Sequence, residues 1–188
     1  MKKALCLLLI ICWQFLSARA QQKEITHKLE ANGNSNCLST GIDIPFGKFS
    51  STHRIGFGLN YSWSHHRYGD MNEIPLKLLG FTFNSGADHY TGKKENTGYI
   101  RYTYNDYTYL HTYAGIIYNP SKKINISLTA GPALGLYAGH SQFNLGVNLS
   151  GSYYLTKNIA ITPAIMLMKE SDSDPLSTSI VRVVYSFW

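Results

Sequence analysis

Large apolar residues alternate with small or polar residues along most of the chain after residue 36. In the stretch 54–63, alternate positions hold Ile, Phe, Leu, Tyr and Trp, and Gly, Asn and Ser lie between them. The same alternation recurs at 124–137 and 143–155. Because successive side chains of a β-strand point to opposite faces, this period of two predicts strands with one apolar face and one small or polar face.

The length of the predicted strands separates two fold classes. A soluble β-sandwich also alternates, but its strands are most often about 5–6 residues long. A strand that crosses a bilayer at a tilt needs about 9–11 residues, and several stretches here reach that length. A closed barrel leaves no unpaired backbone groups in lipid. We therefore expect an all-β, closed antiparallel transmembrane β-barrel, with apolar side chains toward lipid and Gly, Asn, Ser and Thr toward the lumen.

The number of strands is open from the pattern alone. Nine separable stretches follow it: 37–46, 53–63, 75–83, 97–105, 107–118, 124–137, 142–155, 159–168 and 177–188. Bacterial barrels made of one chain have even numbers of strands. We prefer eight strands, with 97–118 as one long strand that projects beyond the membrane. The alternative is ten strands, with a tight hairpin at Asn105 and Asp106 and a further strand at 24–30.

Breaks in the pattern predict the connections. Two short polar breaks, 119–123 and 156–158, are typical of tight turns on the periplasmic side of a barrel. Longer breaks at 64–74, 84–96 and 169–176 are predicted to be loops. Pro132 and Pro163 lie inside strand patterns, where each removes a ladder hydrogen bond. We expect a bulge or a strand end near each proline.

The first 20 residues have the form of a cleaved signal peptide. Lys2 and Lys3 precede an uncharged run at 4–18, and small residues flank the expected cleavage site after Ala20. The uncharged run is too short for a membrane-spanning helix, which needs about 20 apolar residues. We assign 1–20 to the signal peptide, 21–35 to a short periplasmic N-terminal segment and 36–188 to the barrel domain.

Charge and cysteine content narrow the possible partners. The chain has 17 Lys and Arg against 11 Asp and Glu, and Lys2, Lys3 and Arg19 belong to the predicted signal peptide. The remaining positive excess is too small to indicate nucleic-acid binding. Cys37 is the one cysteine after residue 20, so a disulfide within one chain is not expected.

The chain resembles the small outer-membrane β-barrel proteins of Gram-negative bacteria, the porin-family or OmpA/OmpX-like barrels. The likeness rests on 41–49 with 55–58, on 153–161 and on 181–188. It implies an integral outer-membrane monomer surrounded by lipid and lipopolysaccharide, and it implies no particular activity.

The C-terminal stretch resembles the signal that the barrel-assembly machinery reads, with Tyr185, Phe187 and Trp188 as its candidate residues. Val181, Val183, Tyr185 and Phe187 are in phase on one face. Trp188 departs from the family's pattern because it is one residue beyond that phase.

Candidate chemistry begins with the seven histidines: His27, His53, His65, His66, His89, His111 and His140. Small barrels of the lipid A deacylase type are marked by a His-x-Ser pair on one strand face. In this chain no histidine has Ser two residues later. His65 and His66 with Asp70 and Glu73 fit a solvated loop better than a metal site. We therefore predict no catalytic residue, cofactor or metal. A lipid A acyl-modifying enzyme and a narrow solute channel remain the alternatives.

Tyrosines are concentrated between residues 99 and 113. The cluster comprises Tyr99, Tyr102, Tyr104, Tyr107, Tyr109 and Tyr113. It fits the aromatic girdle at a membrane interface. Alternatively, Tyr99 to Tyr109 form an exposed surface for an extracellular protein or glycan, because tyrosine combines contact area with a hydrogen-bonding tip.

Two charges are predicted to face the lumen. If Ile42 and Ile44 face lipid, Asp43 faces inward, and Arg182 does so by the same alternation. The first and last strands of a closed barrel are neighbours, so we predict a contact of Asp43 with Arg182, joined by Arg101 and His111. A charge in a narrow lumen needs a partner, and eight strands enclose just enough room for side chains. The leading interpretation is a plugged, non-enzymatic structural or interaction barrel.

Overall fold

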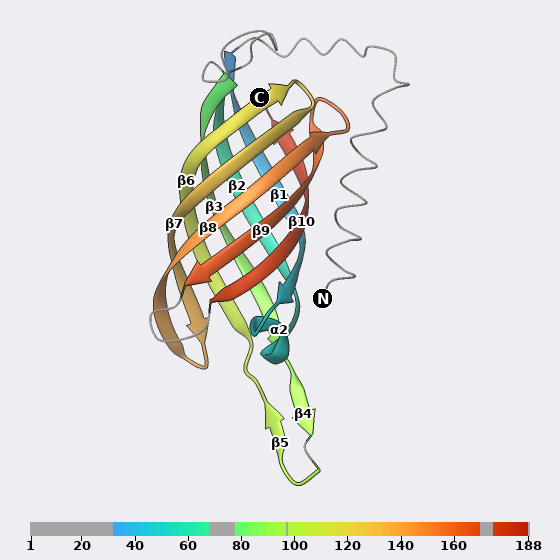
Figure 1. Cartoon of the computed structure of the whole chain (residues 1–188), viewed down its shortest axis with the longest axis vertical. Coiled ribbons are helices and arrows are strands. Elements are labelled where there is room, and N and C mark those ends of the chain that lie inside the picture. The colour runs from blue at the N-terminus through green and yellow to red at the C-terminus, as the bar shows by residue number, and fades with distance from the viewer. Residues whose placement is uncertain (1–31, 68–77, 97, 170–174, 188) are drawn as a thin grey trace.

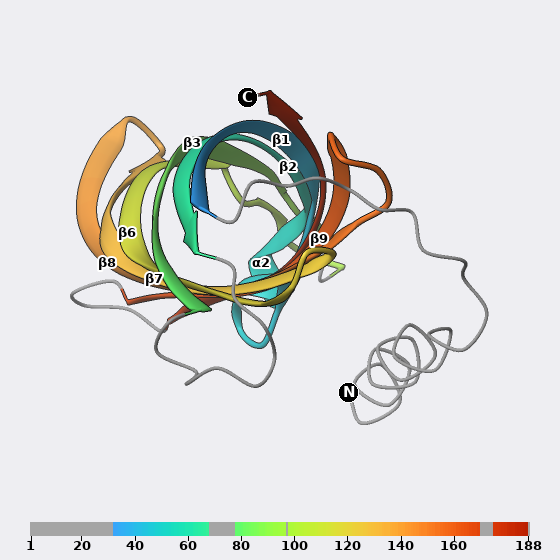
Figure 2. The same ribbon diagram turned by 90° about the horizontal axis from the view of Figure 1, so that it is seen from above.

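Eight strands close into an antiparallel barrel in the computed structural model, which describes residues 32–67, 78–96, 98–169 and 175–187 (Figures 1 and 2). Around the barrel the strand order is β1-β10-β9-β8-β7-β6-β3-β2. The barrel strands are β1 Asn32–Phe46, β2 His53–Arg67, β3 Leu79–Gly92, β6 Tyr107–Ser121, β7 Ile124–Tyr137, β8 His140–Tyr154, β9 Ile159–Lys169 and β10 Leu176–Phe187. The preference for eight strands is confirmed, and the described residues leave no place for ten in the barrel.

Hydrogen bonds between β1 and β10 close the barrel. Ile42 pairs with Val181 and Gly41 with Arg182 along this seam. The first and last strands are therefore neighbours, as the closed-barrel prediction required. Among the described residues no helix is long and apolar enough to span a membrane.

The two ends of the barrel differ. β1 begins and β10 ends at one end, which we call the terminus end, and the short connections from β6 to β7 and from β8 to β9 lie there (Figure 1). The opposite end, the hairpin end, carries the helix α2 Phe49–Thr52 and a two-stranded hairpin of β4 Lys94–Asn96 and β5 Arg101–Thr103. This hairpin projects beyond the barrel (Figure 1).

Several predicted boundaries were wrong. Residues 84–92 belong to β3 and not to a loop, and 97–118 is not one long strand, because β5 is separated from β6 at Tyr107. β1 begins at Asn32, so it includes the last residues of 21–35, the predicted periplasmic N-terminal segment. Residues 64–67 are part of β2. The predicted signal peptide, the extra strand at 24–30, Trp188 and the segment 68–77 lie outside the described residues.

The two strand prolines produce neither bulge nor strand end. Pro132 pairs with Leu145 within β7 and β8, and Pro163 pairs with Val181 within β9 and β10. Each proline also has a second neighbouring strand, β6 for Pro132 and β8 for Pro163. Two residue pairs are missing from the ladder with that strand, and the pairing then continues in the same register. The missing N–H therefore costs ladder bonds on one side only, while both strands continue.

The alternation of side chains agrees with the prediction for a barrel in lipid. Apolar side chains such as Phe57 and Leu145, which are 67% and 64% exposed, point outward. Ser, Thr and Asn side chains of the same strands are buried inside. Aromatic residues on the outer face gather near the terminus end, where Tyr61, Trp63 and Tyr185 lie on β2 and β10. An apolar belt with interfacial aromatics is the surface that a bilayer requires.

Candidate functional site

A buried group of charges crosses the lumen near its middle. Nη2 of Arg182 on β10 lies 3.8 Å from Oδ1 of Asp43 on β1 and donates a hydrogen bond to Oδ1 of Asp88 on β3. Both carboxylates are fully buried. The predicted contact of Asp43 with Arg182 is present, but Asp88 is the closer partner. Sequence reasoning missed Asp88 because it placed residues 84–96 in a loop.

His111 completes this charge cluster, as predicted. Its Nδ1 lies 3.2 Å from Oδ2 of Asp88, and its ring stacks on Tyr113 with 4.8 Å between the ring centroids. Arg101 does not take part. It lies exposed on β5, in the hairpin that leaves the barrel. The prediction for Arg101 was wrong because it treated β5 and β6 as one strand.

The strand next to Asp88 leaves room for the ion pair, because Gly58 of β2 is the direct cross-strand partner of Asp88. Gly58 on β2 faces the pair, and a Cβ atom at this position would overlap Oδ1 of Asp88 and lie 2.8 Å from Nη2 of Arg182. Because an unpaired buried charge is costly, the arrangement depends on Arg182 holding both acids.

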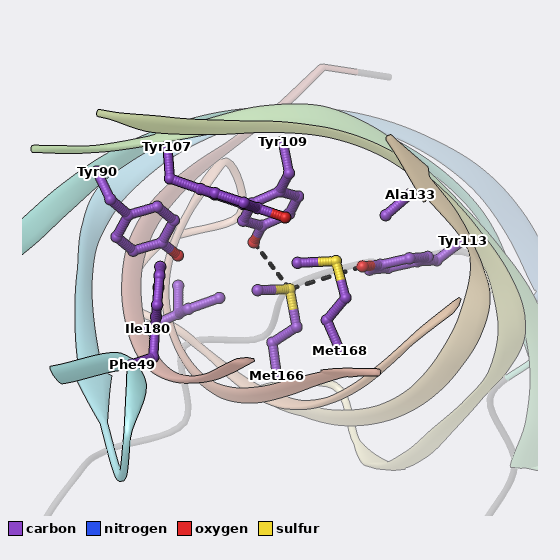
Figure 3. Close-up of a cluster of buried hydrophobic side chains, with 9 residues drawn as sticks. All are labelled: Phe49, Tyr90, Tyr107, Tyr109, Tyr113, Ala133, Met166, Met168 and Ile180. Atoms are coloured by element: carbon purple, nitrogen blue, oxygen red, sulfur yellow. Dashed lines mark hydrogen bonds between the residues drawn. The ribbon is translucent and has the colours of Figure 1, made fainter. Parts of the chain in front are cut away.

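Next to the charge cluster, aromatic and thioether side chains fill the lumen (Figure 3). The hydroxyl of Tyr109 lies 2.8 Å from Sδ of Met166, and that of Tyr113 lies 3.7 Å from the same sulfur. Phe49 of α2 reaches this group and meets Tyr90 edge-on, with 4.9 Å between the ring centroids. We call this group the lumen plug; its members are Phe49, Tyr90, Tyr107, Tyr109, Tyr113, Ala133, Met166, Met168 and Ile180.

The tyrosine cluster of the sequence is divided between two environments. Tyr107 and Tyr109 point into the barrel and are buried, so the expectation of an exposed surface at these positions was wrong. Tyr99 and Tyr102 are exposed on the projecting hairpin region, and Tyr104 is half-buried beside Tyr102, with 5.4 Å between their ring centroids. None of these five contributes to the outward aromatic belt of the barrel wall.

Two hollows border the lumen plug. On its terminus side a cavity of about 90 Å³ is lined mainly by hydroxyl and amide side chains, such as Ser64 and Asn84. On its hairpin side an open pocket of about 450 Å³ lies between α2, the β7 to β8 turn and the start of β6. We call this second hollow the mouth pocket.

Aromatic and basic side chains form the mouth pocket. The rings of His53, Tyr107 and Tyr137 form a cluster in which each contacts the other two, with centroids 5.9 to 6.2 Å apart. Lys48 and His140 also line the pocket, and no acidic residue is among its described lining residues. The pocket therefore offers ring faces together with groups that can bind an anion.

The paired histidines of the sequence separate across the barrel wall. His65 points outward and contacts Oδ1 of Asn34 through Nδ1 at 2.8 Å, whereas His66 is buried in the lumen. Both lie in β2, so our prediction of a solvated loop was wrong for them; Asp70 and Glu73 lie outside the described residues. Within the described ranges no three His, Cys, Asp or Glu side chains are grouped to hold a metal ion.

The barrel has solved structural counterparts, although no protein-family model and no curated protein sequence matches the chain. One is Ail, the attachment invasion locus protein of Yersinia pestis, in complex with the heparin analogue sucrose octasulfate: 14% identity, a TM-score of 0.56, and coverage of 82% of this chain and 99% of that chain.

A second structure of Ail is 13% identical, with a TM-score of 0.54 and coverage of 85% of this chain and 100% of that chain. The outer membrane protein Ail in a phospholipid bilayer nanodisc is 16% identical, with a TM-score of 0.51 and coverage of 82% of this chain and 100% of that chain. These likenesses show a shared fold, that of a small outer-membrane barrel.

Proposed function

We propose that this chain, an outer-membrane β-barrel by fold, is a plugged barrel that binds acidic carbohydrate at its mouth pocket. In this proposal the hairpin end faces the cell exterior and the terminus end faces the periplasm. The single observation that carries it is the mouth pocket, which combines clustered rings with basic side chains.

The size and chemistry of the mouth pocket support a sugar ligand. Its volume of about 450 Å³ lies within the range of about 300–1,000 Å³ for small-molecule sites. The rings of Tyr107 and Tyr137 provide apolar faces and hydroxyl tips. Lys48 and His140 can interact with a carboxylate or sulfate group. Ail, which shares the fold, has been solved with a polysulfated disaccharide analogue of heparin.

The projecting hairpin extends the same surface. Tyr104 lines the mouth pocket and contacts Tyr102 on β5, and Tyr99 beyond it is fully exposed. Aromatic side chains thus continue from the pocket onto the hairpin. A chain of several sugar rings, rather than a single one, fits this arrangement.

A blocked lumen fits a binding role better than a solute channel. The lumen plug places Tyr90, Tyr109, Tyr113 and Met168 across the interior, each with 1% or less of its surface exposed. The buried ion pair of Arg182 and Asp88 lies beside it. We therefore expect the folded protein to give no large, stable conductance in planar bilayers. Such a conductance would contradict the plugged state.

Calorimetric titration of the refolded full chain tests carbohydrate binding, with sucrose octasulfate as the probe and a neutral maltooligosaccharide as the comparison. We expect binding of the sulfated sugar alone, weakened about tenfold by Tyr137→Ala, since truncating a hot-spot aromatic costs more than about 1 kcal/mol. His140→Ala should weaken it less.

His89→Ala is the matched control, because His89 is exposed on the outer wall of β3 and does not line the pocket. This control should bind like the parent. Equal loss in the control and in His140→Ala would place the sugar elsewhere. Absence of binding to the parent would overturn the proposal.

A further inference from the structure

A second group of buried polar side chains lies at the terminus end of the lumen. Oγ of Ser35 on β1 lies 2.7 Å from Nε2 of His66 on β2. Nδ1 of the same histidine lies 3.0 Å from Oδ1 of Asn119 on β6. The three residues are 0%, 1% and 2% exposed. A serine, a histidine and an amide are thus connected in series across three strands.

The surrounding carbonyl groups fix the direction of these hydrogen bonds. Nδ2 of Asn119 donates to the carbonyl oxygens of Arg67 at 3.3 Å and Leu78 at 3.4 Å. Its Oδ1 therefore faces the imidazole and accepts the proton on Nδ1 of His66. The other nitrogen, Nε2, is left with its lone pair toward Ser35. In this tautomer the hydroxyl of Ser35 donates to Nε2.

This polarity is the one that nucleophilic catalysis requires. A serine is activated when an adjacent base can take its proton, and the base is held in the correct tautomer by a third group. We propose that Ser35, His66 and Asn119 form the catalytic triad of an esterase for small acyl esters. Ser35 is the nucleophile, His66 the general base, and Asn119 the positioning residue. This activity is separate from the carbohydrate binding proposed for the mouth pocket.

The neighbouring cavity sets the class of substrate. Ser35 and His66 both border the cavity of about 90 Å³ on the terminus side of the lumen plug. That volume is well below the range of about 300–1,000 Å³ typical of small-molecule sites, so it accepts an acetyl group but no long acyl chain. Hydroxyl and amide groups such as Ser62 and Asn148 line the same cavity, and groups of this kind can donate to a negatively charged oxygen. The lumen plug separates this cavity from the mouth pocket at the hairpin end.

The reaction balances with water as the only co-reactant. Oγ of Ser35 attacks the ester carbonyl carbon while its proton moves to Nε2 of His66. The ester C–O bond then breaks, and the proton on Nε2 passes to the leaving alkoxide, which departs as an alcohol. Water next attacks the acyl carbon and gives a proton to Nε2. The bond from the acyl carbon to Oγ breaks, the carboxylic acid leaves, and Oγ regains the proton.

The His-x-Ser criterion applied to the sequence could not find this group. Its members come from β1, β2 and β6, and His66 and Asn119 are 53 positions apart in the sequence. The pairing of β1 with β2 brings Ser35 opposite Ser64, which is two residues from His66 on the same inner face of β2.

Covalent labelling of the refolded full chain tests the proposal. Methanesulfonyl fluoride is small enough for the cavity, and peptide mass spectrometry locates its adduct. We expect sulfonylation of Ser35 and hydrolysis of methyl acetate, measured as the release of acetic acid at constant pH. Ser35→Ala should abolish both, and Asn119→Ala should slow both by about a hundredfold or more, in line with the about 10²–10⁴-fold contribution of a positioned base.

Two controls separate catalysis from folding and from thiol reactivity. Thr178→Ala removes a buried inward hydroxyl of β10 that does not line this cavity and should leave labelling and hydrolysis unchanged. Cys37→Ala removes the buried thiol 4.0 Å from Oγ of Ser35 and should also leave the adduct in place. If Ser35 stays unmodified in the folded parent, and the parent hydrolyses the ester no faster than Ser35→Ala, the proposal is overturned and the three residues only stabilise the barrel.

Discussion

The guanidinium of Arg182 on β10 binds the carboxylate of Asp88 on β3 across the barrel lumen, although the two residues are 94 positions apart in the sequence. Asp43 lies against the same guanidinium from β1. One cation therefore serves two buried carboxylates, and the stability of the barrel depends on it.

Removing this cation should destabilise the barrel strongly. Arg182→Leu leaves Asp43 and Asp88 buried without their partner, and breaking a buried pair in this way costs about 3–5 kcal/mol. Urea unfolding of the refolded protein in lipid vesicles measures the loss. Arg101→Leu is the matched control, because Arg101 lies exposed on the projecting hairpin and should change the free energy of unfolding by less than about 0.5 kcal/mol. Equal effects of the two substitutions would contradict the ion-pair assignment.

Filling the space beside Gly58 should also destabilise the barrel. Gly58→Ala would push a methyl group into Asp88 and Arg182, and overpacking of this kind costs about 1–3 kcal/mol. Gly151→Ala provides the comparison, because the nearest atom to its Cβ would be 3.9 Å away. The same unfolding measurement should show a loss for the first variant and little change for the second. A tolerated Gly58→Ala would mean that the ion pair can shift without penalty.

Opening the lumen plug should turn the barrel into a conductor. Tyr109→Ala combined with Met166→Ala removes two side chains that meet across the lumen, and we expect this to open a path between the terminus-side cavity and the mouth pocket. We expect single-channel steps in planar bilayers for the double variant and none for the parent. Leu134→Ala, on the lipid-facing side of β7, controls for a general loss of packing and should not conduct.

Placing an arginine on the apolar outer wall should cost free energy of unfolding that depends on its depth in the membrane. Val147 is the eighth of the 15 residues of β8 and points outward. Val147→Arg should lower the free energy of unfolding in vesicles by about 2–4 kcal/mol, the cost of Arg at the bilayer midplane. Leu155→Arg should cost only about 0–1 kcal/mol, because Leu155 is in the turn between β8 and β9 at the terminus end. Similar costs at both positions would argue against a membrane across the middle of the barrel.

The alternation of residue types determined which way many side chains point. Ile42 and Val181 face outward, and Asp43 and Arg182 face inward, because the direction of a side chain is a local property of an extended backbone. Neighbouring first and last strands follow from closure. The contact of Asp43 with Arg182 could therefore be predicted without coordinates.

Local pattern could not locate the ends of the strands where both faces carry similar residues. Ser85, Gly86 and Ala87 offer no contrast between faces, so the sequence alone suggested a loop. In the barrel, β3 continues through them because β2 and β6 supply hydrogen-bond partners on both sides. That extension is what brings Asp88 and Tyr90 into the lumen.

The sequence by itself thus determined the fold class, the lipid-facing wall and the inward direction of Asp43 and Arg182. Only the tertiary structure decided that Tyr107 and Tyr109 fill the lumen, that Asp88 is the closer partner of Arg182, and that Ser35 meets His66. The reason is physical: side-chain direction is set within one strand, whereas a contact across the lumen depends on the register of every strand pair between its two members.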